Sequence, residues 1–116
     1  MPQLTELALF TNNVEGLAIF YHTLLGIDPV AKSEGVAIFM VGQTKIFIHK
    51  NYSPDEGELP PENHWAFTVA NVDAACQDLQ TKGLQIEIEP RNYYWGCSAY
   101  LRDPDGHLIE LNQPAA

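Results

Sequence analysis

The stretch DPDGHLIEL, residues 103–111, decides how this chain folds. Its first four residues are typical of a tight turn, because proline presets one backbone angle and Asp and Gly accept the remaining ones. The apolar residues after the turn indicate a strand, and Glu110 stands between Ile109 and Leu111. A carboxylate inside a strand of a small protein lies either at a solvated rim or in a functional site.

The chain contains two similar halves, and this strand belongs to the second of them. The stretch ELALFTNNVEGLAIFYHTLLGI (6–27) aligns with HWAFTVANVDAACQDLQTKGLQI (64–86), so that Asn13 coincides with Asn71 and Gly26 with Gly83. The asparagines are suitable helix N-caps, and the glycines suit the left-handed position that ends a helix. Each half therefore predicts one strand and one helix, followed by three more strands.

The later strands are expected at residues 29–32, 36–41 and 45–50 in the first half and at residues 85–89, 98–102 and 107–112 in the second. Between the halves, NYSPDEGELPPEN (51–63) is rich in proline and acids and predicts a loop. We expect a single domain, 1–116. Module one is about 1–50, the linker about 51–62 and module two about 63–116.

Alternation along the strands assigns their side chains to two faces of each sheet. One parity is apolar and is expected to pack under the helices: Leu7, Leu9, Ile46, Ile48, Trp65, Phe67, Ile109 and Leu111. The other parity carries polar side chains from four strands: Glu6, His49, His64 and Glu110. If the two half-sheets curl toward each other, this second face becomes the inside of a cup.

Composition narrows the possible partners. The 116 residues are 46% hydrophobic and carry a formal net charge of −9, so we expect no binding to nucleic acid or to an anionic membrane.

The sequence shows no apolar run long enough to span a bilayer and no signal-peptide pattern. Two cysteines, Cys76 and Cys97, are too few for a disulfide scaffold. A cytoplasmic location is the expectation.

These residues resemble a known group of proteins. The doubled module, the first helix GLAIFYHTLLGI (16–27) and the turn and strand DPDGHLIEL look like the vicinal oxygen chelate superfamily, which contains glyoxalase I, bleomycin-resistance proteins and extradiol dioxygenases. The resemblance covers nearly the whole chain. It implies an α+β fold of two tandem βαβββ modules, whose curved mixed sheets form a cup with the helices outside. The superfamily hosts several reactions and also metal-free binders.

In metal-dependent members of this group, an ion is held in the cup by side chains from the first and last strands of the modules. Carried over by position, the resemblance implies Glu6, His64 and Glu110 as ligands. The fourth position falls on Phe47, where glyoxalase-I-like enzymes have a carboxylate or amide. Three-ligand members, resembling extradiol dioxygenases and fosfomycin-resistance thiol transferases, lack that ligand. His49, two residues further on, is a candidate substitute or proton carrier.

One histidine and two carboxylates suit divalent Mn, Fe, Ni, Co or Zn, with positions left open for substrate and water. The ion would polarise two neighbouring oxygens of a bound molecule as a Lewis acid. Either Glu110 or Glu6, on leaving the metal, or His49 would then act as the base. The catalytic candidates are therefore Glu110 and His49.

A substrate-binding wall is the functional interpretation of EPRNYYWGCSAY, residues 89–100. Tyr93, Tyr94 and Trp95 combine aromatic bodies with polar tips, which suit a small organic ligand, and Arg91 is a candidate partner for an anionic group. Phe47 would line the same cup. The alternatives are a packed hairpin or a dimer contact for the aromatic residues, and a surface arginine.

Two functions from different classes remain open. The first is a divalent-metal-dependent lyase, isomerase or dioxygenase-type enzyme that acts on a small oxygen-rich molecule. The second is a metal-free protein that sequesters a small ligand, like the bleomycin-resistance proteins, with no cofactor. For either function we expect a homodimer, because each open half-sheet has only one helix and needs a partner. If the modules are swapped, Glu6 of one chain would meet His64 and Glu110 of the other.

Overall fold

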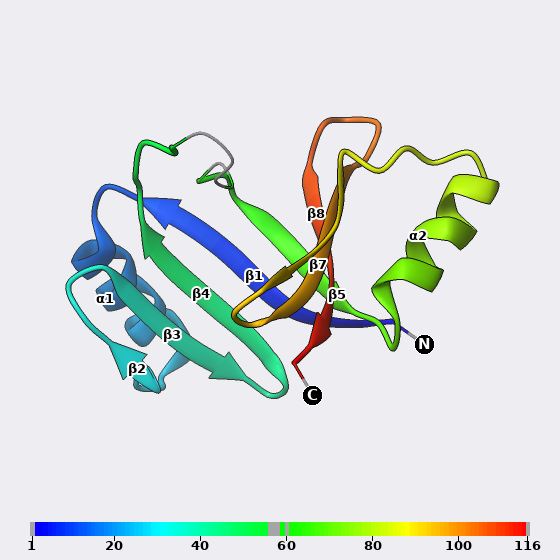
Figure 1. The fold of residues 1–116 in the computed structure, drawn as a ribbon. Helices are drawn as coiled ribbons and strands as arrows, with labels where there is room; N and C mark the ends of the chain where they lie inside the picture. Colours follow the sequence, from blue (N-terminus) through cyan, green and yellow to red (C-terminus); the bar gives the residue numbers. More distant parts are fainter. Residues whose placement is uncertain (1, 56–58, 60, 116) are drawn as a thin grey trace. The chain divides into compact units, whose positions relative to one another are not determined.

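The computed structural model describes residues 2–55, 59 and 61–115. Along this part of the chain, a strand, a helix and three strands occur twice in succession (Figure 1). The first set is β1 (Gln3–Thr11), α1 (Val14–Leu25), β2 (Ala31–Lys32), β3 (Val36–Val41) and β4 (Thr44–Lys50). The second set is β5 (His64–Thr68), α2 (Val72–Thr81), β6 (Ile88–Tyr93), β7 (Gly96–Arg102) and β8 (Leu108–Pro114). The predicted α+β fold with two βαβββ modules is confirmed.

The chain divides into two compact units, and the division falls inside β1. The first unit combines the chain up to Thr5 with the chain from His64 onward, and the second runs from Glu6 to Asn63. Part of the predicted linker, residues 56–58 and 60, lies outside the described residues. The predicted module limits and the predicted cup stay predictions.

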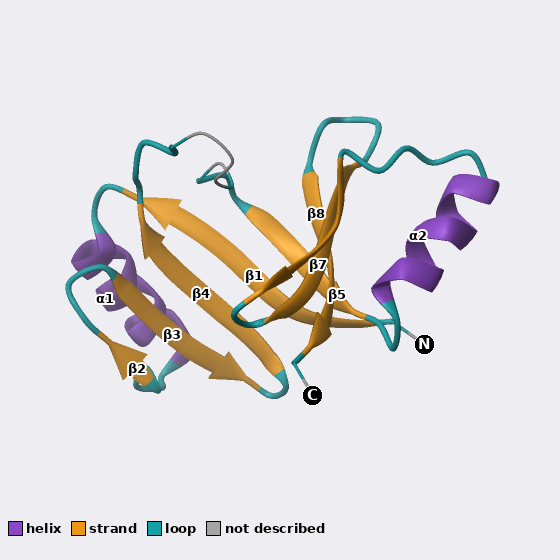
Figure 2. Ribbon diagram, viewed as in Figure 1, coloured by secondary structure: helices purple, strands orange, loops and turns teal. Residues whose placement is uncertain are grey.

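In the unit Glu6–Asn63 the strand order is β2-β3-β4-β1, with β4 parallel to β1 and antiparallel to β3. Leu7 lies opposite Ile46 in this register. Helix α1 covers one face of these strands (Figure 2). Its residues Val14 and Ala18 join a buried cluster that contains Ala37, Phe39, Ile46 and Ile48, and Leu7 and Leu9 pack against it. The predicted helix-facing parity is therefore correct here.

In the other unit the strand order is β5-β8-β7-β6, and β5 runs parallel to β8. Helix α2 buries Val72 and Cys76 in a cluster with Ala99, Leu101 and Leu111. Its N-cap is the predicted one, since the Asn71 side chain accepts a hydrogen bond from the Ala74 amide at 2.9 Å. Because α2 covers one face of the strands, the other face is left to Ser98, Tyr100 and Glu110.

The turn before β8 is held by Asp103. One carboxylate oxygen accepts hydrogen bonds from the amides of Asp105 and His107 at 3.0 and 2.9 Å, and the other lies 2.8 Å from the His107 ring. These contacts with His107 lower the pKa of Asp103 below its usual range. The turn therefore fixes where β8 begins, and with it the position of Glu110 two residues into the strand.

Two details differ from the sequence expectations. The strand expected at residues 85–89 begins instead at Ile88 and continues to Tyr93, with an irregular register between Ile88 and Arg91. Pro90 has no amide proton to donate, which accounts for an interrupted ladder at that point. Trp65, expected under α2, contacts the His107 ring, with 5.5 Å between the ring centroids and an angle of 33° between the ring planes.

No helix among the described residues is long and apolar enough to cross a membrane.

The first prediction concerns the backbone of Gly96, at the turn between β6 and β7. Its φ of 138° is nearly restricted to glycine, and a Cβ there would collide with the Gln113 carbonyl. We expect Gly96→Ala to lower the free energy of unfolding by on the order of 3 kcal/mol, measured by urea denaturation.

Gly42→Ala is the matched control. Gly42 also has a positive φ, 61°, but open space where a Cβ would stand, so that only the backbone penalty of roughly 1 kcal/mol applies. Equal losses in the two variants would show that the close approach at Gln113 contributes nothing.

Candidate metal centre

Glu110 is a carboxylate buried on the face of β8 that α2 does not cover. In the sheet register it lies opposite Ala66 of β5 on one side and Tyr100 of β7 on the other. Glu110 is only 5% exposed. A carboxylate so far removed from water needs close polar partners, because an isolated buried charge costs several kcal/mol. The solvated-rim interpretation of Glu110 is thereby excluded.

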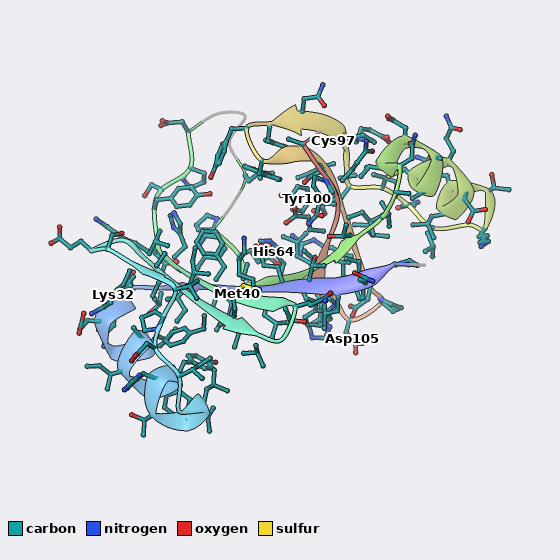
Figure 3. The ribbon with its side chains drawn as sticks, turned by 90° about the horizontal axis from the view of Figure 1, so that it is seen from below. Lys32, Met40, His64, Cys97, Tyr100 and Asp105 are labelled. Carbon is teal, nitrogen blue, oxygen red and sulfur yellow. The ribbon has the colours of Figure 1, made fainter. Side chains whose placement is uncertain are left out.

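The first partner is His64, the first residue of β5. Its Nε2 atom lies 3.1 Å from Oε1 of Glu110, and both side chains are nearly buried. The His64 ring also meets Tyr100 edge to face, with 5.9 Å between the ring centroids, and the two are labelled in Figure 3. The parallel pairing of β5 with β8 brings the histidine and the carboxylate together.

The second partner of Glu110 is Ser98 of β7, which is fully buried. Its hydroxyl donates a hydrogen bond to Oε2 of Glu110 at 2.9 Å and accepts one from Nε1 of Trp95, also at 2.9 Å. Each carboxylate oxygen of Glu110 thus has its own neighbour, His64 on one side and Ser98 on the other. This arrangement fixes the plane of the carboxylate.

Glu6 is the third predicted ligand, and it belongs to the other unit. It follows Thr5 directly in β1, and the Thr5 hydroxyl is 2.8 Å from that of Thr68 in β5. Within its own unit, a Glu6 carboxylate oxygen lies 3.8 Å from the Lys45 amine. The pair His64 and Glu110 lies within one unit, and Glu6 as the third ligand stays a prediction.

The chemistry of this set suits a divalent ion. Imidazole nitrogen and carboxylate oxygen are the ligand types that Mn, Fe, Co, Ni and Zn share. Nε2 of His64 and Oε1 of Glu110 are already close enough for one ion to bind both. The hydrogen bond from Ser98 to the remaining oxygen is the kind of outer contact that orients ligating carboxylates. The residues present therefore fit a metal.

The aromatic residues of the predicted substrate-binding wall lie in two different environments. The rings of Tyr93 and Trp95 stack in parallel with centroids 4.4 Å apart, whereas Tyr94 is 93% exposed and meets only the edge of Trp95. Arg91 lies opposite Ser98 in the β6–β7 register. Through Trp95 and its hydrogen bond to Ser98, this hairpin is joined directly to Glu110.

His49 and Phe47 lie in β4, in the unit Glu6–Asn63. The His49 ring contacts Phe10, Phe47 and Tyr52, with centroid distances between 5.5 and 5.8 Å. Its Nδ1 atom is 2.6 Å from the Lys50 carbonyl oxygen. His49 is thus part of an aromatic cluster, and its catalytic role and the ligand contact of Phe47 stay predictions.

Sequence reasoning missed Ser98 and Tyr100, which both contact the ligand pair. The available signal was the polar parity of CSAYLR, residues 97–102, in which Ser98 and Tyr100 alternate with apolar residues. Cys97, of the opposite parity, packs against the α2 cluster, and burial raises the pKa of its thiol.

Comparison with known proteins identifies the family of the chain. Residues 3–111 match the family model described as the Glyoxalase/Bleomycin resistance protein/Dioxygenase superfamily. The chain belongs to this superfamily.

Similar proteins from bacteria include two transferases. The chain is 28% identical to "Glutathione transferase FosA" of Serratia marcescens over 97% of its own length and 81% of that protein. It is 25% identical to "Metallothiol transferase FosB" of Shouchella clausii over 94% of its length and 78% of that protein. A hypothetical protein, BH1468 of Bacillus halodurans, shares the fold with a TM-score of 0.77 at 18% identity, over 99% of this chain and 96% of that one.

The second prediction concerns the contribution of the Ser98 hydroxyl to metal affinity. Ser98→Ala removes the hydrogen bond that orients Glu110, so we expect the affinity for Mn²⁺ to fall about 10- to 100-fold in calorimetric titration. Thr68→Val is the control, because the Thr68 hydroxyl bonds Thr5 and Asn112 and not Glu110. Wild-type affinity in Ser98→Ala would contradict the orienting role.

Proposed function

We propose that this protein is a divalent-metal-dependent enzyme, with Glu6, His64 and Glu110 as the metal ligands. The observation that carries the proposal is the buried pair of His64 and Glu110, 3.1 Å apart, with Ser98 holding the second carboxylate oxygen. A surface ion pair would not need this degree of burial.

In this proposal each residue of the site has a separate role. The metal, Mn, Fe, Ni, Co or Zn, would supply Lewis acidity toward two neighbouring oxygens of the substrate. Glu110 and His64 bind it, and Ser98 and Trp95 keep the Glu110 carboxylate in one orientation. We propose His49 as the residue that moves a proton, with Glu110 as the alternative base. The Lys45 amine neutralises part of the charge on Glu6 while no cation is bound.

For the substrate we propose a small oxygen-rich molecule, held between the metal and the hairpin that carries Arg91, Tyr93 and Trp95. Two similar proteins are named as transferases of glutathione or of a metallothiol type. Addition of a thiol to the metal-bound molecule is therefore the first reaction to screen, ahead of lyase, isomerase and dioxygenase reactions.

The metal site is tested directly by metal content and affinity. Wild-type protein purified without chelators or a histidine tag is expected to bind about one Mn²⁺ per chain and to melt at a higher temperature when the ion is added. Glu110→Gln and His64→Ala each remove a ligand, and we expect affinity to fall more than about 100-fold in both.

Glu89→Gln removes an exposed carboxylate elsewhere on the same unit and serves as the matched control. If Mn²⁺, Ni²⁺, Fe²⁺ and Zn²⁺ all leave the melting temperature of the wild type unchanged, the metalloenzyme proposal is wrong. The metal-free ligand-binding function then takes its place. The net charge of −9 favours that alternative, since it suits a cationic ligand.

We also propose that the protein forms a homodimer. Helix α1 carries large apolar side chains that remain well exposed in the single chain: Ile19, Phe20 and Leu24. Contiguous apolar surface of this kind commonly marks a protein contact. Light scattering is expected to give twice the 12.9 kDa mass of one chain, and Leu24→Glu is expected to lower it toward a single chain. A wild-type mass of 12.9 kDa across the micromolar range would refute the dimer.

A further inference from the structure

His64 lies in the first pair of the parallel ladder between β5 and β8. Its pairing partner is Leu108, and each of the two residues is also the first residue of its strand. The end pairs of a ladder open at a much lower free energy than the pairs inside it. A histidine whose Nε2 atom lies 3.1 Å from the Glu110 carboxylate therefore needs a further restraint at this end of β5.

The other end of β5 has a restraint of its own. The Thr68 hydroxyl donates a hydrogen bond to Oδ1 of Asn112 at 2.7 Å, and the Val69 amide donates one to the Asn112 carbonyl oxygen at 2.9 Å. These bonds join the last residue of β5 and the residue after it to β8. The start of the strand, where His64 lies, depends on different contacts.

Trp65 supplies a contact at the start of β5. It follows His64 directly, and because side chains alternate along a strand it projects to the face opposite Glu110. Its ring contacts the ring of His107, the residue before β8, with 5.5 Å between the ring centroids. The contact therefore connects the second residue of β5 to the residue that precedes β8, beside the first pair of the ladder.

The His107 ring is fixed by Asp103, although 55% of the His107 side chain is exposed. Nδ1 of the ring lies 2.8 Å from Oδ2 of Asp103, and the His107 amide donates a hydrogen bond to Oδ1 at 2.9 Å. One carboxylate thus holds both the backbone and the ring of His107. A ring that is already ordered loses less conformational entropy when it packs against Trp65.

We propose that Trp65 and His107 are positioning residues, which hold the start of β5 against the start of β8 and so keep His64 at its distance from Glu110. They act through the strands, because Trp65 projects to the face opposite the ligand pair. This inference rests on the proposed metal function, since the residue that they position is a proposed metal ligand.

Two variants of His107 separate its ring contact from its contact with Asp103. His107→Ala removes both, whereas His107→Phe keeps an aromatic ring against Trp65 and loses only the contact with Asp103. We expect His107→Ala to lower Mn²⁺ affinity about 3- to 10-fold in calorimetric titration, and His107→Phe to stay within about twofold of the wild type. The melting temperature without metal should fall in both variants, because both lose the contact with Asp103.

His22→Ala is the matched control. His22 is also an exposed histidine beside a carboxylate, with Nδ1 3.3 Å from Asp28, but it lies in helix α1 of the other unit. Its removal should leave Mn²⁺ affinity unchanged. Equal Mn²⁺ affinity in the wild type and His107→Ala overturns the inference. An equal loss in His107→Ala and His107→Phe also overturns it, because the effect would then belong to Asp103 and not to the ring contact.

The two proposals fail separately. If the wild type takes up no Mn²⁺, the metal function is wrong, and hydrogen exchange of the backbone amides of residues 64–66 is measured in the metal-free protein. Faster exchange in His107→Ala than in both the wild type and His107→Phe upholds the positioning role of the ring contact. Exchange that is equal in all three proteins, or equally fast in the two variants, rejects it.

Discussion

The buried carboxylate of Glu110 is the constraint on which the described site depends. Its two oxygens are divided between His64 and Ser98, at 3.1 and 2.9 Å. Desolvating a carboxylate costs several kcal/mol unless its contacts replace water, and each of these contacts comes from a different strand. The parallel pairing of β5 with β8 and the antiparallel pairing of β7 with β8 must therefore both be in register. The site and the sheet stabilise each other.

The same dependence explains what the sequence could predict. Alternation in LALF and HLIEL (residues 7–10 and 107–111) placed Glu110 and the helix-facing leucines correctly, because the parity of a strand is local information. The element order followed from caps and turns such as Asn71, which act within a few residues. Both modules could be recognised without knowledge of long-range pairing.

Ser98 could not be found in that way, and Tyr93, although named as a candidate, could not be distinguished from Tyr94. Their relevance arises from the register of β6 on β7 and of β7 on β8, and that register depends on an irregularity after Ile88 and a turn at Gly96. In the sequence, Tyr93 and Tyr94 are equivalent neighbours; in the structure one hydroxyl is buried and the other side chain is 93% exposed. A shift of one residue in the hairpin would exchange them, and no local pattern specifies the shift.

The burial of the cysteines has a practical consequence for thiol chemistry. Cys76 lies in the α2 cluster, and burial raises the pKa of its thiol and that of Cys97, so both favour the unreactive protonated form at neutral pH. Disulfide exchange requires a thiolate. Glutathione-containing buffers and alkylating reagents should therefore react more slowly with these two cysteines than with an exposed thiol of ordinary pKa.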